Sequence, residues 1–341
     1  MHYFVTGHTG FKGAWLVQML RAQGHVVSGQ SLDPLTGSLF ETANLAAVLE
    51  HDFRIDIRDA ERTLAAITTA RPDVVVHLAA QPLVRAAYEN PQETYSTNVI
   101  GTMNVLGAVS ACDSVQAHLV ITTDKVYRYV NQISGYKEND PLGGDDPYSA
   151  SKAMADILTQ SWITSFPGCP TAIARAGNVI GGGDVSRDRL LPDLLAAFAA
   201  GDAAVLRYPD AVRPWQHVLD CLNGYLLLVD TLLADPSAGA GAWNFGPPDS
   251  SAVSVAEIAD LAASLWGEGA SWSTTGQKQP HEAALLTLNS EKARAELHWH
   301  DRLDVSAAVG WTVEWEQGRI GGAPSADLCA GQLQAFAALG S

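Results

Sequence analysis

The sequence predicts an α/β fold in which helices cover both faces of a doubly wound parallel sheet, and a smaller lobe follows toward the C-terminus. Through the first half of the chain, short runs of apolar and β-branched residues alternate with helical patterns. The runs are continuously apolar, which is typical of strands that are buried on both faces. This alternation of strands and helices indicates βαβ units and therefore parallel strands.

The predicted elements of the sheet follow one another in order. Strands are expected at residues 3–6, 25–28, 53–56, 73–77, 118–122 and 171–174. Helices are expected at residues 14–23, 59–70, 91–112 and 148–166. Each of these helices lies between two consecutive strands, as a crossover between parallel strands requires.

The pattern changes after Asn178. A glycine-rich loop, a helix near residues 190–200 and a series of shorter elements follow. Ser254 and Glu257 match a capping box that opens a helix to about Trp266. We therefore expect two parts. The sheet domain comprises residues 1–177 plus 217–243, and the smaller substrate lobe comprises residues 178–216 plus 244–341.

The composition indicates an acidic protein with enough apolar residues to fill a core. Apolar residues make up 47% of the chain and charged residues 17%, and the formal net charge is −16. Such a surface repels phosphate backbones and anionic lipids. We therefore expect no nucleic acid and no membrane as a partner. An anionic ligand should bind only where glycine amides, a helix N-terminus or a few arginines form a local positive pocket.

The cysteine spacing and the N-terminal sequence bear on compartment and metal content. The four cysteines lie far apart, at positions 112, 169, 221 and 329. This spacing predicts neither a disulfide framework nor a metal site. There is no charged leader followed by an apolar run, and no stretch of about 18 apolar residues. We expect a cytoplasmic protein with reduced thiols.

A glycine-rich loop joins the first predicted strand to the first predicted helix. Its sequence is Gly7-His8-Thr9-Gly10-Phe11-Lys12-Gly13, with the spacing G-x-x-G-x-x-G. Glycines let the backbone turn tightly and approach a pyrophosphate, whose charge then meets the helix N-terminus. At the start of a βαβ series, this loop predicts a dinucleotide site on a Rossmann-type fold. The candidate contacts in the loop are Gly7, Thr9, Gly10, Phe11, Lys12 and Gly13.

Carboxylates after the second and third strands are candidates for the nucleoside end of that site. Asp33 lies 20 residues after the last loop glycine, where a carboxylate can bind the ribose hydroxyls and repel a 2′-phosphate. We therefore expect NAD rather than NADP. Two observations leave alternatives open: the aspartate precedes a proline and could form a simple turn, and Lys12 could serve a 2′-phosphate. Asp56 and Ile57, at the end of the third strand, are candidates for contact with the adenine.

A tyrosine and a lysine lie four residues apart at the start of the helix that follows the fifth strand. Tyr148 and Lys152 share one face of that helix. A nearby ammonium lowers the pKa of a phenol, which can then take a proton from a carbinol at neutral pH. An exposed helix pair is the alternative, but ligands of such folds bind at the carboxyl ends of the strands. Thr123, Asp124 and Lys125 stand at that end of the fifth strand, so we predict that all five residues are catalytic.

Several motifs together resemble the extended short-chain dehydrogenase/reductase family, many of whose members modify nucleotide-activated sugars. The motifs are the Thr-Gly-x-x-Gly-x-x-Gly loop from Thr6, His77-Leu78-Ala79-Ala80, Asn98, the Tyr148/Lys152 pair and Arg213-Pro214-Trp215-Gln216-His217-Val218. They cover nearly the whole chain in the order that the family has. The resemblance implies that NAD is the cofactor and that Leu78, Ala79, Ala80 and Asn98 contact it.

Within this family the chain resembles the nucleotide-sugar 4,6-dehydratases, and among them the branch that acts on CDP-glucose. The longest matching stretch is Ala174-Arg175-Ala176-Gly177-Asn178-Val179-Ile180-Gly181-Gly182-Gly183-Asp184. The lysine of the Thr-Asp-Lys stretch stands where most of these dehydratases have glutamate. The cytidine base rests on the resemblance alone, because no feature of the residues derives it.

The resemblance also implies a mechanism. Tyr148 would take the C4 hydroxyl proton as NAD accepts hydride from C4, while Thr123 holds the same oxygen. The C5 proton would then leave, Asp124 would protonate the departing 6-hydroxyl, and NADH would return hydride to C6. Lys125 would act as the C5 base or, if it stays charged, would stabilise the enolate.

The family pattern further implies contacts with substrate and with a second subunit. Asn178 and Arg213 should contact the diphosphate of a nucleotide sugar, and Arg189 is a weaker candidate. His281 could line the nucleotide-sugar pocket or belong to a turn after Pro280. Relatives pair through the helices equivalent to residues 91–112 and 148–166, so a homodimer is expected.

Two other functions fit parts of the same pattern. A nucleotide-sugar 4-epimerase shares the first oxidation but needs no acid and base for the loss of water, so the Thr-Asp-Lys stretch argues against it. A non-catalytic dinucleotide sensor would have no use for the Tyr-Lys pair. The final deoxysugar and the pathway cannot be read from the residues.

Overall fold

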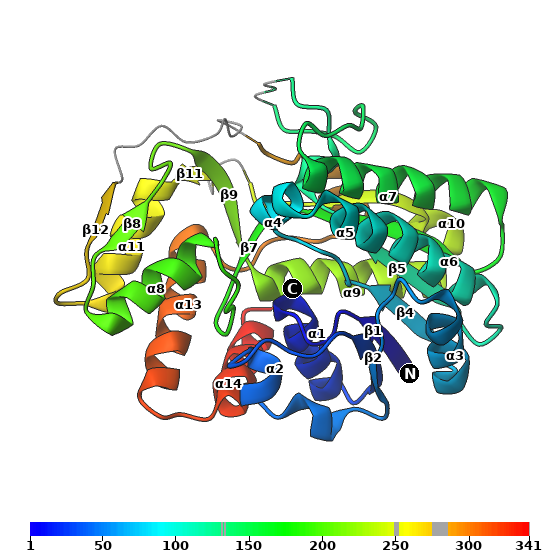
Figure 1. The fold of residues 1–341 in the computed structure, drawn as a ribbon, viewed down its shortest axis with the longest axis horizontal. Helices are drawn as coiled ribbons and strands as arrows, with labels where there is room; N and C mark the ends of the chain where they lie inside the picture. Colours follow the sequence, from blue (N-terminus) through cyan, green and yellow to red (C-terminus); the bar gives the residue numbers. More distant parts are fainter. Residues whose placement is uncertain (131, 133, 249–251, 275–285, 341) are drawn as a thin grey trace.

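The computed structural model describes residues 1–130, 132, 134–248, 252–274 and 286–340 (Figure 1). Within these residues the main sheet has seven strands, all parallel, in the order β3-β2-β1-β4-β5-β6-β10. The strands are β1 (His2–Thr6), β2 (Val26–Ser31), β3 (Asp52–Arg54), β4 (Val74–His77), β5 (Ala117–Ile121), β6 (Thr171–Ala176) and β10 (Gly241–Phe245). The chain winds one way from β1 to β3 and the other way from β4 onward, which confirms the doubly wound fold.

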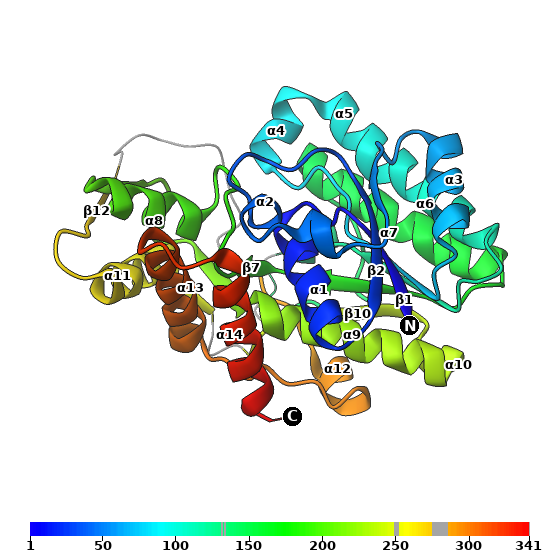
Figure 2. The same cartoon turned by 90° about the horizontal axis from the view of Figure 1, so that it is seen from below.

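Helices cover both faces of this sheet (Figures 1 and 2). One layer comprises α3 (Ala60–Ala70), α4 (Val84–Glu89), α5 (Pro91–Tyr95), α6 (Thr102–Ser110) and α7 (Pro147–Ser165). The other layer comprises α1 (Phe11–Ala22), α2 (Leu39–Thr42), the short 3-10 helix η1 (Leu45–Val48), α9 (Val218–Ala234), α10 (Pro236–Gly239) and α14 (Ser325–Ala338). No described helix combines the length and the apolar content that a membrane span needs.

Alternate residues of the central strands pack into the two layers. In β1, Tyr3 and Val5 belong to the core beneath α1 and α9, whereas Phe4 belongs to the core beneath α3 and α6. In β4, Val75 likewise faces the second core. Because both faces of each strand need apolar side chains, the runs in the sequence are continuously apolar. The predicted central strands therefore correspond to buried strands, whereas the edge strand β3 is only partly buried.

The smaller lobe lies beyond the carboxyl ends of the main strands and has its own apolar core. It contains the sheet of β7 (Asn178–Ile180), β9 (Val212–His217) and β11 (Ala252–Ser254), and the pair of β8 (Ala204–Leu206) and β12 (Trp272–Thr274). Its helices are α8 (Leu190–Ala200), α11 (Val255–Trp266) and α13 (Val305–Ile320). The capping box of Ser254 and Glu257 is present at the start of α11, as predicted.

The predicted division into two domains stays a prediction, and the packing adds detail to it. Strand β10 belongs to the main sheet and continues past residue 243 to Phe245. Helix α12 (Glu291–Glu296) contacts β10, and α14 contacts α1. Segments assigned to the smaller lobe therefore also cover the sheet domain, because apolar residues such as Trp299 and Phe336 complete its core.

Two helices differ in detail from the expected ones. The helix expected at residues 91–112 is α5, a π-helical segment η2 (Ser96–Gly101) and α6 in succession. The sequence pattern does not reveal the π-helical hydrogen bonds, because they shift the side-chain register by only one residue. The helix that carries the Tyr-Lys pair begins at Pro147, with the Asp146 carboxylate accepting a hydrogen bond from the Ser149 amide at 3.0 Å.

A buried carboxyl group ties the C-terminal segment to α9. The Asp220 carboxylate accepts hydrogen bonds from the backbone amides of Arg302 at 2.7 Å and Leu303 at 3.3 Å. The pKa of Asp220 is raised to about 7, mainly by burial and in part by the nearby Asp301 carboxylate. The group therefore holds its proton in the folded state at pH values where the unfolded chain has lost it. Its contribution to stability is full below about pH 4 and is lost as the pH rises through about 7.

Asp220→Asn should change the pH dependence of stability. The amide is neutral at every pH. The free energy of unfolding of the variant minus that of wild type should therefore rise by about 1–2 kcal/mol when the pH is raised from about 6 to about 8. Urea unfolding at both pH values measures the difference. Asp235→Asn is the control, because Asp235 is an exposed helix cap that is ionised in both states over this range. A wild-type-to-variant difference that is the same at both pH values would contradict the assignment.

Candidate active site

A cleft of about 1580 Å³ opens between the carboxyl ends of the main strands and the smaller lobe. Its lining begins at the glycine loop, passes the ends of β4 and β5, and reaches the loop between β7 and α8. The sheet order reverses between β1 and β4, and ligands of open α/β sheets bind at such a switch point. Pockets for a drug-sized ligand occupy about 300–1,000 Å³, so this cleft has room for two ligands side by side.

The glycine loop forms a cradle that larger residues would fill. Gly7 has a φ of +75°, and a Cβ there would lie 2.7 Å from the backbone nitrogen of Ala79. A Cβ on Gly13 would collide with the carbonyl oxygen of Gly7. Gly10 is the N-cap of α1 and supplies no side-chain cap, so the first amides of the helix remain available to an anion. These features fit a dinucleotide pyrophosphate.

The nucleoside end of the cleft is organised by contacts around Leu32. The Thr9 hydroxyl is 2.7 Å from the Ser31 hydroxyl and donates to the Leu32 carbonyl at 3.2 Å. Arg54 donates to the same carbonyl at 3.2 Å and forms an ion pair with Asp52 at 2.6 Å. The sequence identifies no arginine next to Asp33, yet the structure places Arg54 beside the preceding residue.

The structure brings some of the predicted cofactor residues to the cleft and leaves others outside it. Asp56, Ile57 and residues 78–80 line the cleft. Hydrogen bonds from Arg58 to Asp56 lower the pKa of that carboxyl group. Asp33 is exposed and is not among the lining residues, although Leu32 is. Its role in choosing NAD over NADP stays a prediction.

Asn98 also lies outside the lining. Its amide oxygen accepts from the Gln81 backbone nitrogen at 2.8 Å, and its amide nitrogen donates to the Ser151 hydroxyl at 2.9 Å. The side chain is buried on η2 and joins the loop after β4 to α7. In this structure Asn98 therefore supports the loop that lines the cleft, and a direct contact with the cofactor stays a prediction.

The Tyr-Lys pair lies in the cleft as the sequence predicts. The Lys152 ammonium is buried and donates to the Ile121 carbonyl at the end of β5 at 2.7 Å. The pKa of Lys152 is lowered to about 8, mainly by burial and in part by Lys12, while Asp156 opposes the shift. Burial raises the pKa of Tyr148, which is opposite to the lowering that the sequence predicts from Lys152, while a hydrogen bond with Thr123 opposes the rise. Both side chains therefore stand next to the end of the fifth strand.

Asp124 is a buried carboxyl group at the floor of the cleft. The Thr123 hydroxyl donates to its Oδ1 at 2.8 Å, and its Oδ2 has no hydrogen-bond partner among the described residues. Burial raises the pKa of Asp124, although Lys125, Thr123 and Arg213 each oppose the shift. Desolvation thus outweighs the neighbouring cations, so the carboxyl group is suited to donate a proton. Lys125 also lines the cleft and is only partly buried.

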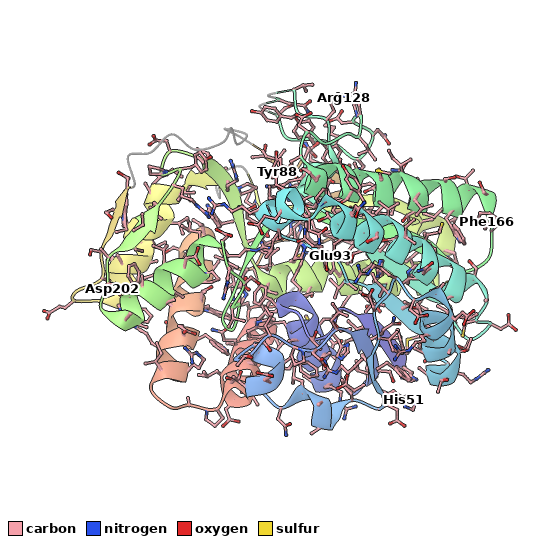
Figure 3. All side chains as sticks on the ribbon, viewed as in Figure 1. His51, Tyr88, Glu93, Arg128, Phe166 and Asp202 are labelled. Atoms are coloured by element: carbon pink, nitrogen blue, oxygen red, sulfur yellow. The ribbon has the colours of Figure 1, made fainter. Side chains whose placement is uncertain are left out.

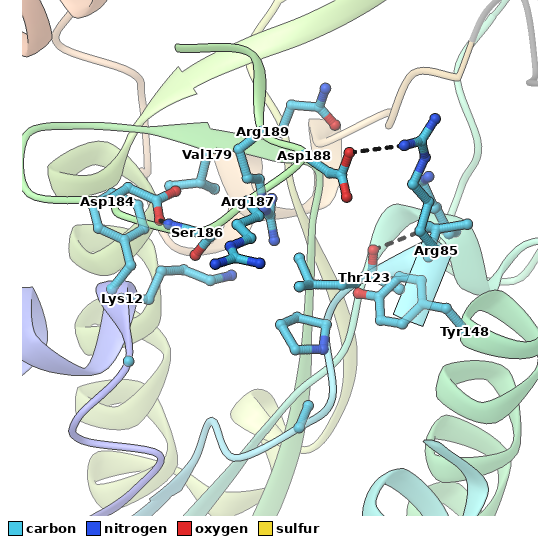
Figure 4. Close-up of a pocket in the computed structure, with 18 of the residues that line it drawn as sticks. Lys12, Arg85, Thr123, Tyr148, Val179, Asp184, Ser186, Arg187, Asp188 and Arg189 are labelled. Atoms are coloured by element: carbon cyan, nitrogen blue, oxygen red, sulfur yellow. Dashed lines mark hydrogen bonds and ion pairs between the residues drawn. The ribbon is translucent and has the colours of Figure 1, made fainter. Parts of the chain in front are cut away.

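Lys12 points away from the nucleoside end of the site. Its ammonium donates to the Tyr225 hydroxyl at 3.4 Å, and burial lowers the pKa of Lys12. Figure 4 shows its side chain in the same part of the cleft as Arg187, opposite Thr123 and Tyr148. The suggestion that Lys12 serves a 2′-phosphate stays a prediction, and in this structure the side chain is directed toward α9.

The predicted substrate residues gather on the lobe side of the cleft. Asn178 begins β7, Arg189 directly precedes α8, and Arg213 lies on β9. All three line the cleft, and their roles stay predictions. His281 lies outside the described residues. In the described lining there is no group of three or more His, Cys, Asp or Glu side chains that could hold a metal ion.

Apart from Arg58, which pairs with Asp56, three arginines that the sequence analysis assigned to no site line the cleft. Arg85 comes from α4, Arg187 from the loop before α8 and Arg207 from the segment after β8. The alternation of arginine and aspartate at residues 187–189, which includes the predicted substrate residue Arg189, is a signal that could have identified Arg187. Arg85 and Arg207 carry no such signal, because only the folded chain brings them together.

A parallel sheet with a glycine cradle at its switch point and a Tyr-Lys pair in the same cleft defines a dinucleotide-dependent redox enzyme. The model of the NAD dependent epimerase/dehydratase family matches residues 3–246, and the chain belongs to this family. NAD is therefore its cofactor.

Known proteins agree with this assignment. The chain is 44% identical over 328 residues to CDP-glucose 4,6-dehydratase of Salmonella typhimurium, covering 94% of this chain and 91% of that protein. It is 29% identical over 322 residues to a dTDP-glucose 4,6-dehydratase of Streptomyces griseus, covering 92% and 93%. The solved dTDP-glucose 4,6-dehydratase of Streptomyces venezuelae, which contains NAD, superposes with a TM-score of 0.81 at 25% identity, covering 96% and 100%.

Tyr148→Phe should separate dinucleotide binding from chemistry. The ring keeps its packing but loses the group that accepts a proton, so the affinity for NAD should change little. Turnover should fall about 10²–10⁴-fold. Steady-state rates and a fluorescence titration with NAD measure the two effects. Tyr88→Phe is the control, since Tyr88 also lines the cleft but has no assigned role; turnover of Tyr148→Phe within a few-fold of wild type would mean that another residue is the base.

Proposed function

We propose that this enzyme is a lyase that removes water from a nucleotide-activated glucose to give the 4-keto-6-deoxy sugar. The nucleotide sugar that we propose as substrate is CDP-glucose. The observation that carries the proposal is the buried Asp124 carboxyl group beside Thr123 and the Tyr-Lys pair. A simple dehydrogenase or epimerase needs no neutral acid at this place. The 44% identity to a CDP-glucose 4,6-dehydratase supports the same reaction and is the basis for cytidine as the base.

The cradle of the glycine loop fits the cofactor. Gly7 and Gly13 would let the pyrophosphate approach the backbone, and Lys152 would be among the residues that hold the cofactor. When bound, NAD would supply the acceptor for a hydride from the sugar, and the reduced cofactor would later return that hydride to the same sugar.

The residues of the chain would handle the protons. Tyr148 would take the proton of the C4 hydroxyl, and Thr123, which bonds both Tyr148 and Asp124, would hold the same oxygen. The 4-ketone acidifies the proton at C5. Asp124, whose pKa is raised by burial, would then give its proton to the departing 6-hydroxyl so that water leaves. Lys125 would receive the C5 proton or stabilise the negative charge on the C4 oxygen.

The proposal is tested directly with substrate. The protein is incubated with NAD and, separately, with CDP-, dTDP-, UDP- and GDP-glucose, and the products are analysed by mass spectrometry and by proton NMR. We expect loss of one water, fastest from CDP-glucose. A product of unchanged mass with inverted C4 would indicate an epimerase instead, and no change with any substrate would refute both readings.

Lys125→Ala should stall the reaction after the first oxidation. The variant keeps the Tyr-Lys pair, so substrate should still reduce NAD, but the C5 proton cannot leave efficiently and reduced cofactor should accumulate on the enzyme. Absorbance at 340 nm and exchange of the C5 proton with deuterated solvent measure the two effects. Lys137→Ala removes an exposed ammonium and is the control. Release of dehydrated product at a near-normal rate would show that Lys125 is a bystander.

We further propose that two copies of the chain pair through α7 and the preceding helical segment of α5, η2 and α6. Large apolar side chains are exposed along these helices and at the end of α7, namely Ile100, Met103, Met154, Ile157 and Phe166. Figure 3 shows Phe166 at the outer end of α7. An exposed apolar face of this kind is typical of a protein interface. Sedimentation equilibrium at micromolar concentration tests the pairing of two copies, and a mass of one chain contradicts it.

Localisation to the cytoplasm stays a prediction.

A further inference from the structure

Asp188 links two arginines that come from opposite sides of the cleft. Its carboxylate lies 3.2 Å from Arg85 and 2.6 Å from Arg207. Arg85 belongs to α4 beside the main sheet, whereas Asp188 and Arg207 belong to the smaller lobe. All three line the cleft, and Figure 4 shows the contact between Arg85 and Asp188 above Thr123 and Tyr148. The three side chains therefore form a bridge over the proposed reaction site.

The backbone holds the aspartate in an unusual conformation. Asp188 has a φ of +60°, a left-handed conformation that few residues other than glycine, asparagine and aspartate adopt. The loop that leads to it is anchored, because the Trp15 indole donates to the Gly182 carbonyl at 2.9 Å, and a Cβ on Gly182 would collide with Trp315. The anchored loop thus directs the carboxylate toward the two arginines.

The bridge is weak enough to be exchanged for another anion. The side chains of Arg85, Asp188 and Arg207 are 54%, 37% and 29% exposed, and ion pairs in such positions are strongly screened by water. One carboxylate carries a single charge and cannot satisfy two guanidinium groups. A diphosphate carries more charge and more acceptor oxygens, and it suits the forked donors of arginine.

The charges around the bridge favour an anion of this kind. Arg187 and Arg189 flank Asp188 and also line the cleft, so the protein gathers cations here despite its overall charge of −16. Asp193, on α8, is close enough for its pKa to be raised by burial and further by Asp188, while Arg207 opposes the shift. Carboxylates thus crowd the arginines and compete with any bound anion.

We propose that Arg85 and Arg207, in addition to the predicted contacts of Asn178 and Arg213, form a clamp for the diphosphate of the nucleotide sugar, and that Asp188 fills this clamp as an internal anion which the substrate displaces. This inference rests on the proposed function for the identity of the ligand. The clamp joins the two sides of the cleft, so binding of the diphosphate positions the sugar over Thr123 and Tyr148. Asp188 keeps the arginines aligned beforehand at a cost in affinity.

The test measures binding of inorganic pyrophosphate to protein saturated with NAD, by isothermal titration calorimetry. Asp188→Asn keeps a residue that tolerates a positive φ but removes the competing charge, so the dissociation constant should fall about threefold to tenfold. Asp184→Asn is the matched control. It removes the same charge from the same loop, and its contact is with the Ser186 amide, so the constant should change less than twofold.

A double and a triple variant test whether the effect of Asp188→Asn on pyrophosphate binding depends on the two arginines. In a protein carrying Arg85→Gln and Arg207→Gln, pyrophosphate should bind at least tenfold more weakly, and adding Asp188→Asn should no longer tighten binding. Unchanged or weaker binding by Asp188→Asn alone, or tightening that persists without both arginines, would overturn the clamp.

The titration involves no turnover, so it is independent of the proposed reaction. Tighter binding by Asp188→Asn in a protein that dehydrates no nucleotide-glucose would reject the proposed function and leave the clamp intact. Normal dehydration with no effect of Asp188→Asn would reject the clamp alone.

Discussion

The buried ion pair between Asp156 and Arg175 is the interaction on which the geometry of the active site depends. Both side chains are fully buried, and two hydrogen bonds of 2.8 Å join them. Asp156 lies on α7 one turn after Lys152, and it also accepts a hydrogen bond from the Thr122 hydroxyl at 2.9 Å. The pair therefore holds α7 against the carboxyl ends of β5 and β6. Loss of either partner would leave an unpaired buried charge, which costs about 3–5 kcal/mol.

The same docking removes water from the reaction site and sets its proton chemistry. Desolvation disfavours charge, so it lowers the pKa of Lys152 and raises the pKa values of Tyr148 and Asp124. Hydrogen bonding through Thr123 and the charges of nearby cations act against the shifts of the two acids. A neutral carboxyl group and a phenol that shares a hydrogen bond with Thr123 can thus coexist within one cleft. The arrangement suits a reaction in which one group accepts a proton and another donates one.

The two parts of the molecule are coupled through tryptophan and glycine contacts rather than through a flexible linker. Trp15 of α1 and Trp315 of α13 enclose Gly182, where no larger residue fits. The loop that carries the arginines on the lobe side is therefore anchored to the sheet domain. Helix α14 adds to this by packing on α1. Rigid support on both sides of a cleft lets exposed, weakly paired groups change partners without moving the catalytic residues.

The sequence by itself determined the parallel strands, the glycine cradle, the capping box of α11 and the position of the Tyr-Lys pair. Each of these depends on residues within one or two turns of one another, so periodicity and spacing are enough. The tertiary structure decided which charges meet across the cleft, because Arg85 and Asp188 are separated by 103 residues. It also directed Asn98 into a buried contact with α7 and decided that desolvation outweighs Lys125 and Arg213 at the Asp124 carboxyl group. Burial is the sum of many distant contacts, and no local pattern of residues contains it.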